Sequence, residues 1–317
     1  MSIKKSHKSI VTALIILVSA LTGNALSAKS DFNIAVFYPD VRKPFSTFFE
    51  AITDGIEKSD YANISIKSVA KEASSSDISD WLKENKPDAV ILLGSSFKRY
   101  SKELDGPFEV IYGATFFSNT RINQGHTGVS ITPDPTLLFG QLKKLSPSVK
   151  QVNVVYHPQT NNWLIERAEI SAKNLNLILK KYPVENIQQA AAAYRDIIST
   201  GNFSNHALWL LQHEPTLDEK SLLPKILADA WRYQQIVFSS NSKHVKRGAL
   251  FSLLPDNNKL GEDLAKKTVT ILNGGNKHIE TMRSSLVVAN IRTAKHLSLS
   301  SEILGREHFA ITYPRQK

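Results

Sequence analysis

The sequence predicts an α/β protein in which two doubly wound lobes, each built on a parallel sheet, are joined by a multi-strand hinge. Short runs rich in β-branched residues alternate with longer amphipathic stretches, which is the pattern of strands connected by crossover helices. The 317 residues are long for a single hydrophobic core, and no Pro/Gly-rich linker divides them. The rhythm stops near residue 128 and restarts, which favours two similar lobes with several crossings between them.

The first series contains four predicted strands separated by helices. Pro44 suits the first turn of one helix, and Ser76 can cap the next. An apolar run between Asp88 and Gly94 suits a buried parallel strand. The predicted strands are Asn33–Tyr38, Ile64–Val69, Ala89–Leu93 and Phe108–Tyr112, and the predicted helices are Pro44–Glu57, a helix carrying Ile78 and Leu82, and Phe97–Leu104. A turn region at residues 119–128 ends this series.

The second series begins with a helix that Thr132 or Asp134 can cap, because Leu138, Leu142 and Leu145 follow at helical spacing. The next predicted strands are Val152–Tyr156, Leu177–Lys180, Ala207–Leu211 and Ile236–Phe238, with helices at Asn161–Leu175, Ile187–Ile198 and Leu217–Trp231. A strand at Phe251–Leu254 and a helix running to Leu272 come too late in the chain to extend this series simply. A strand at Ser285–Ala289 and a short helix around Ala294 close the pattern.

The N-terminal segment has the composition of a secretory signal peptide. Three lysines precede an apolar run from Ile10 to Leu21, which is shorter than the roughly 20 residues of a membrane span. Small residues follow, and we expect cleavage after Ala28, with Ala25 as the alternative site and an uncleaved anchor helix as the alternative reading. Residues 1–28 are therefore predicted to be removed, and the absence of cysteine predicts a free periplasmic protein rather than a lipoprotein.

Composition and motifs argue against several other classes. The formal charge is +10, but the basic clusters are short and isolated, so we expect no nucleic-acid partner. No Gly-x-Ser-x-Gly elbow, phosphate-binding loop or dinucleotide fingerprint occurs, and we expect neither an enzyme nor a bound cofactor. The nine histidines include no His-Glu-x-x-His pair, which predicts no metal site.

Several blocks along the chain carry a resemblance to a known family. The clearest are Thr127-Gly128-Val129-Ser130, residues 152–158, the turn Arg247-Gly248-Ala249-Leu250, the helix from Gly261 to the stop at Gly274-Gly275, and residues 290–299. In order and spacing they resemble the substrate-binding proteins of ABC transporters, in the family whose best-known members bind tryptophan or tyrosine. The first 120 residues match this family only in pattern.

The resemblance implies a type I periplasmic-binding fold. Residues 31–127 with 255–281 would form the first lobe, and residues 128–254 with 282–317 would form the second. The ligand would lie between the lobes and would be trapped when they close about the hinge. A monomer is expected.

In the first lobe, the candidate ligand residues follow the carboxyl ends of the predicted strands, where open α/β sheets bind ligands. Ser95 and Ser96 stand at a helix start and suit an anionic group, although an ordinary helix cap explains them equally well. Tyr38 could stack on a ligand or simply pack at the rim, and Thr115 could supply a hydroxyl group.

In the second lobe, the resemblance places ligand contacts in three loops. The candidates are Tyr156, Asn161, Asn162, His213, Glu214, Asn241 and Lys243, and helix capping is the alternative role of the pair Asn161 and Asn162. Where the family has aspartates, this chain has His213, Asn241 and Lys243. A buried ammonium group needs a carboxylate partner, so these residues suit a neutral or anionic ligand better than an amino acid.

Two functions fit the sequence. The first is a periplasmic solute-binding protein that traps a small polar organic ligand between its lobes and delivers it to an ABC permease. The second is a sensor subunit of the same fold that reports a ligand, or docks, to a membrane signalling receptor.

Overall fold

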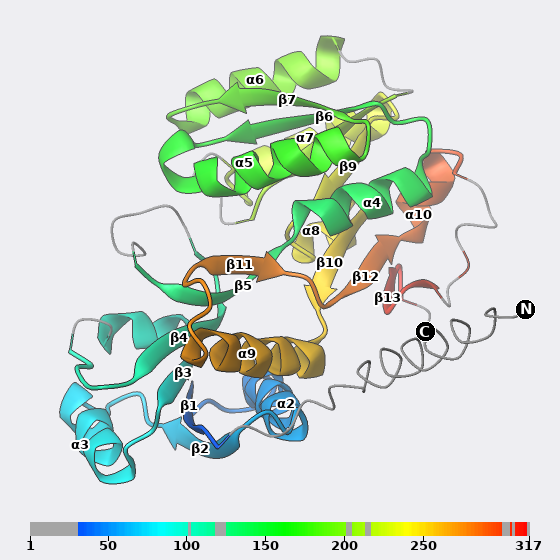
Figure 1. The fold of residues 1–317 in the computed structure, drawn as a ribbon. Coiled ribbons are helices and arrows are strands. Elements are labelled where there is room, and N and C mark those ends of the chain that lie inside the picture. Colours follow the sequence, from blue (N-terminus) through cyan, green and yellow to red (C-terminus); the bar gives the residue numbers. More distant parts are fainter. Residues whose placement is uncertain are drawn as a thin grey trace, which may run out of the picture.

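The computed structural model describes residues 31–100, 103–117, 125–200, 205–212, 217–299, 305 and 308–315. The predicted signal peptide lies outside these residues. The described part has two lobes, each with helices on both faces of a mainly parallel sheet, so the predicted fold class is confirmed (Figure 1). No helix within it combines the length and the apolar character that a bilayer crossing requires.

The first lobe is built on a six-stranded sheet whose order is β11-β5-β4-β3-β1-β2 and whose neighbouring strands are all parallel. Alternate residues of β1 face opposite sides of the sheet. Ile34 and Val36 pack in one apolar cluster with α2 and α9, and Ala35 and Phe37 pack in another with α3 and η1. The elements are β1 (Asn33–Pro39), α2 (Phe45–Lys58), β2 (Asn63–Val69), α3 (Ser75–Asn85), β3 (Ala89–Leu93), η1 (Ser95–Tyr100), β4 (Glu109–Thr115), β5 (Thr127–Pro133), α9 (Asn257–Leu272) and β11 (Ile279–Met282).

The second lobe contains a parallel sheet of order β7-β6-β8-β9 and a smaller sheet of order β10-β12-β13. Leu250, just before β10, donates a backbone hydrogen bond of 2.7 Å to Val237 of β9, so the two sheets lie edge to edge. The elements are α4 (Pro135–Leu145), β6 (Gln151–Tyr156), α5 (Pro158–Asn174), β7 (Ile178–Pro183), α6 (Ile187–Thr200), β8 (His206–Leu210), α7 (Leu222–Arg232), β9 (Ile236–Ser239), α8 (Lys243–Arg247), β10 (Phe251–Pro255), β12 (Ser285–Asn290), α10 (Ile291–His296) and β13 (Ile311–Tyr313).

The chain passes between the lobes three times, from β5 to α4, from β10 to α9 and from β11 to β12 (Figure 1). Hydrogen bonds tie these crossings together. The backbone N–H of Asp134 donates to Met282 O at 3.0 Å, and that of Asp256 donates to Ser284 O at 3.1 Å. The hydroxyl of Thr281 donates to the Asp134 carboxylate at 2.5 Å, and both side chains are buried. The expected lobe boundaries after residues 127 and 281 fall inside β5 and β11, which both continue in the six-stranded sheet.

Some element predictions need correction. Ser74 rather than Ser76 caps α3, through a reciprocal capping box with Asp77. The helix predicted at Phe97–Leu104 is a short 3-10 helix, and α7 begins at Leu222 rather than Leu217. The strands β5, β11 and β13 and the helix α8 were not predicted. Within β5, a Cβ atom on Gly128 would lie 1.9 Å from Tyr112 O, so glycine at this position permits the close pairing of β5 with β4.

Candidate functional site

The candidate site lies at the carboxyl ends of the strands in both lobes. In the first lobe, β1, β3 and β4 run parallel to β5, whose end leads into a crossing. In the second lobe, β6, β8 and β9 are parallel neighbours, so their carboxyl ends share one edge of that sheet. This is the edge at which open α/β sheets bind their ligands.

The structure brings Tyr38 together with the start of η1. Tyr38 is half-buried, and its ring stacks on Phe49 with 6.3 Å between centroids and 26° between planes. Gly94 lies against the same ring, because a Cβ atom there would be 3.3 Å from Phe49. Ser95 and Ser96 follow and are both exposed. An aromatic wall and two hydroxyl groups are therefore adjacent at this rim.

Thr115 lies deeper, at the end of β4. Its side chain is 2% exposed, and its carbonyl accepts a weak 3.4 Å hydrogen bond from Ser130 of β5. The Ser130 hydroxyl also lies 2.9 Å from that of Thr132. These hydroxyl groups are partly satisfied within the sheet, so Thr115 is part of the packed base of the lobe rather than of its exposed rim.

Sequence reasoning missed the aromatic residues of the first turn of α2. Phe45 is 71% exposed, and Phe48 packs edge-on against Phe49 with centroids 5.2 Å apart. An exposed phenylalanine at the end of a strand–loop–helix unit is the kind of group that recognises an apolar part of a ligand. Phe45 could have been identified from the sequence, since it begins the helix that follows β1 just as Ser95 begins the helix that follows β3.

In the second lobe, Tyr156 ends β6 and is buried, as is Asn161 in the first turn of α5. Asn162 is exposed. The residue at the cap position of α5 is His157, whose ring nitrogen Nδ1 lies 3.3 Å from the hydroxyl of Thr160. Neither asparagine occupies the cap position. His213 and Glu214 lie outside the described residues.

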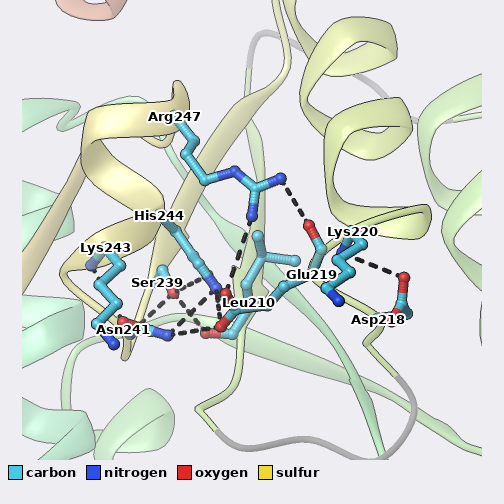
Figure 2. Close-up of polar contacts among 9 residues, drawn as sticks. All are labelled: Leu210, Asp218, Glu219, Lys220, Ser239, Asn241, Lys243, His244 and Arg247. Carbon is cyan, nitrogen blue, oxygen red and sulfur yellow. Dashed lines mark hydrogen bonds and ion pairs between the residues drawn. The ribbon is translucent and has the colours of Figure 1, made fainter.

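Asn241 is held in a network of polar contacts inside the second lobe (Figure 2). Its amide nitrogen donates to the carboxylate of Glu219 at 3.1 Å, and its amide oxygen accepts from the backbone N–H of Lys243 at 3.0 Å. The same amide nitrogen lies 3.3 Å from Nε2 of His244. Asn241 is only 6% exposed, so most of its hydrogen-bonding capacity is directed into the lobe.

Glu219 is a carboxylate near this site that the sequence did not nominate. Arg247 donates to its backbone carbonyl at 2.6 Å and approaches its carboxylate at 3.9 Å, so its negative charge is partly balanced (Figure 2). Burial lowers the pKa of His244, and the hydrogen bond with Glu219 opposes that shift. Glu219 could not be identified from the sequence, because it precedes α7 by several residues and contacts Asn241 only in the folded protein.

Ser239, His244 and Glu219 are in contact, but their geometry is not that of a hydrolase. The hydroxyl of Ser239 lies 2.9 Å from Nδ1 of His244, and it also donates to Leu210 O at 3.2 Å. Ser239 has no exposed surface, so a substrate cannot reach its oxygen. This cluster instead holds α8 against β8 and β9.

Lys243 differs from its neighbours because its side chain is exposed at the start of α8. It therefore presents a positive charge at the carboxyl end of β9, two residues from Asn241, whose partner Glu219 already has a cationic partner in Arg247. This half of the candidate site therefore carries an exposed positive charge.

Three hollows of about 440 to 510 Å³ occur on the described residues, and none of these three is lined by the predicted ligand residues. The candidate residues are divided between two lobes. Among the side chains that the structure describes, no group of three or more His, Cys, Asp or Glu residues is arranged to hold a metal ion.

Comparison with known proteins places this geometry in a family. A family model described as "ABC transporter substrate binding protein" matches residues 110–305, more than half of the chain. No curated protein sequence matches significantly. The fold is similar to that of the ligand-free, open form of a substrate-binding protein with adhesive properties from Clostridium difficile. The sequence identity is 15% and the TM-score is 0.60, and the alignment covers 88% of this chain and 98% of that chain.

A second similar structure is the ABC domain from Streptococcus pneumoniae in complex with L-Trp. It has 19% identity and a TM-score of 0.50, and 89% of this chain and 100% of that chain are covered. At these identities the likeness supports the fold, while the family match covers β4 to the region after α10. The chain therefore belongs to the ABC transporter substrate-binding protein family, which is a family of binding proteins rather than enzymes.

Proposed function

We propose that this protein is the periplasmic solute-binding component of an ABC-type uptake system, and that it traps a small polar organic ligand between its lobes. The observation that carries the proposal is the pairing of two chemically different surfaces at the carboxyl ends of the strands. One carries exposed Phe45, the Tyr38–Phe49 stack and the serines of η1. The other carries Asn162 and Lys243.

Closure would take place about the three crossings. Their shared hydrogen bonds join Asp134 to Thr281 and Met282, and Asp256 to Ser284. Because these bonds connect crossing to crossing, they can persist while the lobes approach. The hinge would thus guide closure without having to break its own polar contacts.

The charges near Lys243 support a neutral or anionic ligand. An amino acid would bring an ammonium group that needs its own carboxylate, since a buried unpaired charge is costly. Glu219 is the carboxylate beside Asn241, and it already contacts Arg247 and Asn241. A ligand carboxylate, carbonyl or hydroxyl group would instead find a donor in Lys243, and its apolar part would meet Phe45.

The proposal includes export through the N-terminal signal, release as a monomer into the periplasm, and docking to an ABC permease. Those steps rest on the family and on the sequence of residues 1–28.

A thermal-shift screen with amino acids, nucleosides, purines and organic acids tests the binding step. A ligand present at 100 times its Kd should stabilise the protein by about 2.7 kcal/mol. Lys243→Gln should weaken the binding of an anionic ligand. Lys144→Gln makes an equal charge change at an exposed position of α4 and should leave ligand binding unaltered. The proposal fails if no small molecule in these classes shifts the melting temperature.

A second candidate is a sensor subunit that docks to a membrane signalling receptor. It is favoured by Asn241, whose side chain is used inside the lobe and offers little to a ligand. Ligand uptake in a deletion strain separates the two functions. Loss of uptake supports transport, and unchanged uptake with an altered signalling output supports the sensor.

A further inference from the structure

The second lobe contains a basic pocket that the candidate site does not use. A hollow of about 460 Å³ lies between α7, the C-terminal end of α8 and α10. An adjoining hollow of about 510 Å³ shares Lys246, Asn290 and Arg292 with it and adds Arg315. We call the two together the α7–α10 pocket. Its combined volume is in the range of small-molecule sites, and no aspartate or glutamate lines either hollow.

The pocket is at the opposite edge of the lobe from the candidate ligand residues. Gln235 and Gly248, which line it, come immediately before β9 and shortly before β10, at the amino ends of these strands. Asn290 ends β12, which is antiparallel to β10 with Ala289 opposite Phe251, so it reaches the same edge. The candidate residues Asn241 and Lys243 follow the carboxyl end of β9. The α7–α10 pocket is therefore a separate surface.

Its positive charges are largely uncompensated. Lys246, Arg292 and Arg315 are all exposed, and none of them forms an ion pair with a carboxylate of the described residues. Arg247 is the exception, because it contacts Glu219. Three cations around connected hollows create a local positive potential that attracts an anion. A doubly charged phosphate group would balance them better than a single carboxylate would.

One wall of the pocket is aromatic and rigid. The ring of His296 stacks on Trp231 with 3.7 Å between centroids and 5° between planes, and its Nε2 donates to Trp231 O at 2.8 Å. The guanidinium of Arg292 lies 5.1 Å from the centre of the Trp231 ring. Leu227, Ala230 and Val237 add apolar lining. An anion with an apolar portion would find partners for both parts.

Gln235 adds a buried polar side chain to the lining of the pocket. It lines the pocket and is only 3% exposed. Its Nε2 donates to His206 O at 2.7 Å, but its buried Oε1 has no hydrogen-bond partner. Buried polar atoms are normally paired, so this acceptor suits a hydroxyl or amine donor on a bound molecule.

We propose that the α7–α10 pocket binds an organic phosphate, with the phosphate group held by Lys246, Arg292 and Arg315 and the organic part placed against Trp231. The phosphate could belong to a free organic phosphate or to a phospholipid headgroup. A headgroup that ends in a phosphate monoester, as in phosphatidic acid, presents the same doubly charged group as a free organic phosphate, and the two sources are separable by experiment.

Isothermal titration calorimetry of the purified protein with phenyl phosphate tests this proposal. Binding should be saturable, tighter than that of inorganic phosphate, and weakened about tenfold or more by Arg292→Gln or Lys246→Gln, the loss of one charge-assisted contact. Lys173→Gln is the matched control, because it removes one exposed charge on α5, away from the pocket. All variants should keep the wild-type circular dichroism spectrum.

Sedimentation with vesicles separates the two sources. Phosphatidic acid vesicles that carry the wild-type protein down but not Arg292→Gln, with phosphatidylcholine vesicles inactive, would identify a lipid headgroup as the source and support the pocket. The proposal is overturned if neither phenyl phosphate nor phosphatidic acid vesicles bind, or if they bind the pocket variants as tightly as the wild-type protein.

Discussion

The packing of α2 against α9 leads to a prediction in which one chemical change has opposite effects at two glycines. A Cβ atom added to Gly261 of α9 would lie 2.1 Å from Ile52 O and 2.8 Å from Ile56 N. A Cβ atom added to Gly140 of α4 would meet nothing within 4 Å. Both glycines are inside helices, so alanine should gain the same helix propensity at each position.

The expected magnitudes follow from these contacts. At Gly140, replacing glycine by alanine should stabilise the protein by about 0.5 to 1 kcal/mol. At Gly261, the contacting atoms belong to the backbone of α2 and cannot rotate away, so the helices must separate. Overpacking of this kind costs about 1 to 3 kcal/mol, and taking the upper end less the propensity gain leaves about 2 kcal/mol of destabilisation.

Urea denaturation followed by far-UV circular dichroism measures both free energies of unfolding. The two variants should differ by about 3 kcal/mol, which is the sum of the two effects. If Gly261→Ala proves as stable as the wild-type protein, the close approach of α2 and α9 is not what the structure implies. If Gly140→Ala is strongly destabilising, the space beside α4 is filled and the reasoning from open space fails.

Three further predictions concern the hinge, pH and a helix cap. Thr281→Val removes a hydrogen-bond donor from the buried Asp134 carboxylate and should lower the free energy of unfolding by about 1.5 to 3 kcal/mol in urea denaturation. The control Thr270→Val, on the exposed face of α9, should lower it by less than about 0.5 kcal/mol. Equal effects would contradict a special role for the hinge bond. Burial holds the pKa of His244 below its ordinary 6.5, so its contribution to stability is full above pH 6.5 and is lost as the unfolded chain takes up the proton at lower pH. Between pH 7.5 and 5.5, Glu219→Gln should make this loss steeper and His244→Gln should flatten it, and a protein more stable at pH 5.5 would refute the assignment. Ser74→Ala should destabilise α3 by about 1 kcal/mol and Ser76→Ala should have little effect, with the reverse order disproving the observed cap.

The sequence predicted the parallel α/β architecture because its strongest signals are periodic. The run Ala89–Leu93 forms β3 with those same bounds, and Leu138, Leu142 and Leu145 all enter the core from α4. Two of the missed strands, β11 and β13, lack such signals. β11 has four residues at the edge of its sheet and includes a glutamate, and β13 has three. Their pairing depends on distant partners, which no local pattern contains.

The sequence could locate the candidate ligand residues only by locating the ends of the strands that precede them. The rule that ligands bind at carboxyl ends drew attention to the loops after β1 and β3, but the residues predicted after β1 included Tyr38 and not Phe45. Exposure decides which residue in such a loop is available. Phe45 is 71% exposed while Thr115 is 2% exposed, and the sequence does not encode that difference locally.

Asn241 shows why the chemistry of the site is harder to predict than its place. In sequence it is a polar residue in a loop that is predicted to bind ligand, and its amide could serve either a ligand or the protein. The fold brings Glu219, from the loop before α7, and His244, from α8, to it, so the amide completes an internal network that anchors α8. Lys243, two residues further on, is then the group left exposed. Glu219→Gln should release Asn241 from this network and make its amide available to ligands. The variant should then bind a wider range of neutral ligands in the same thermal-shift screen. An unchanged ligand range would show that the network does not limit specificity.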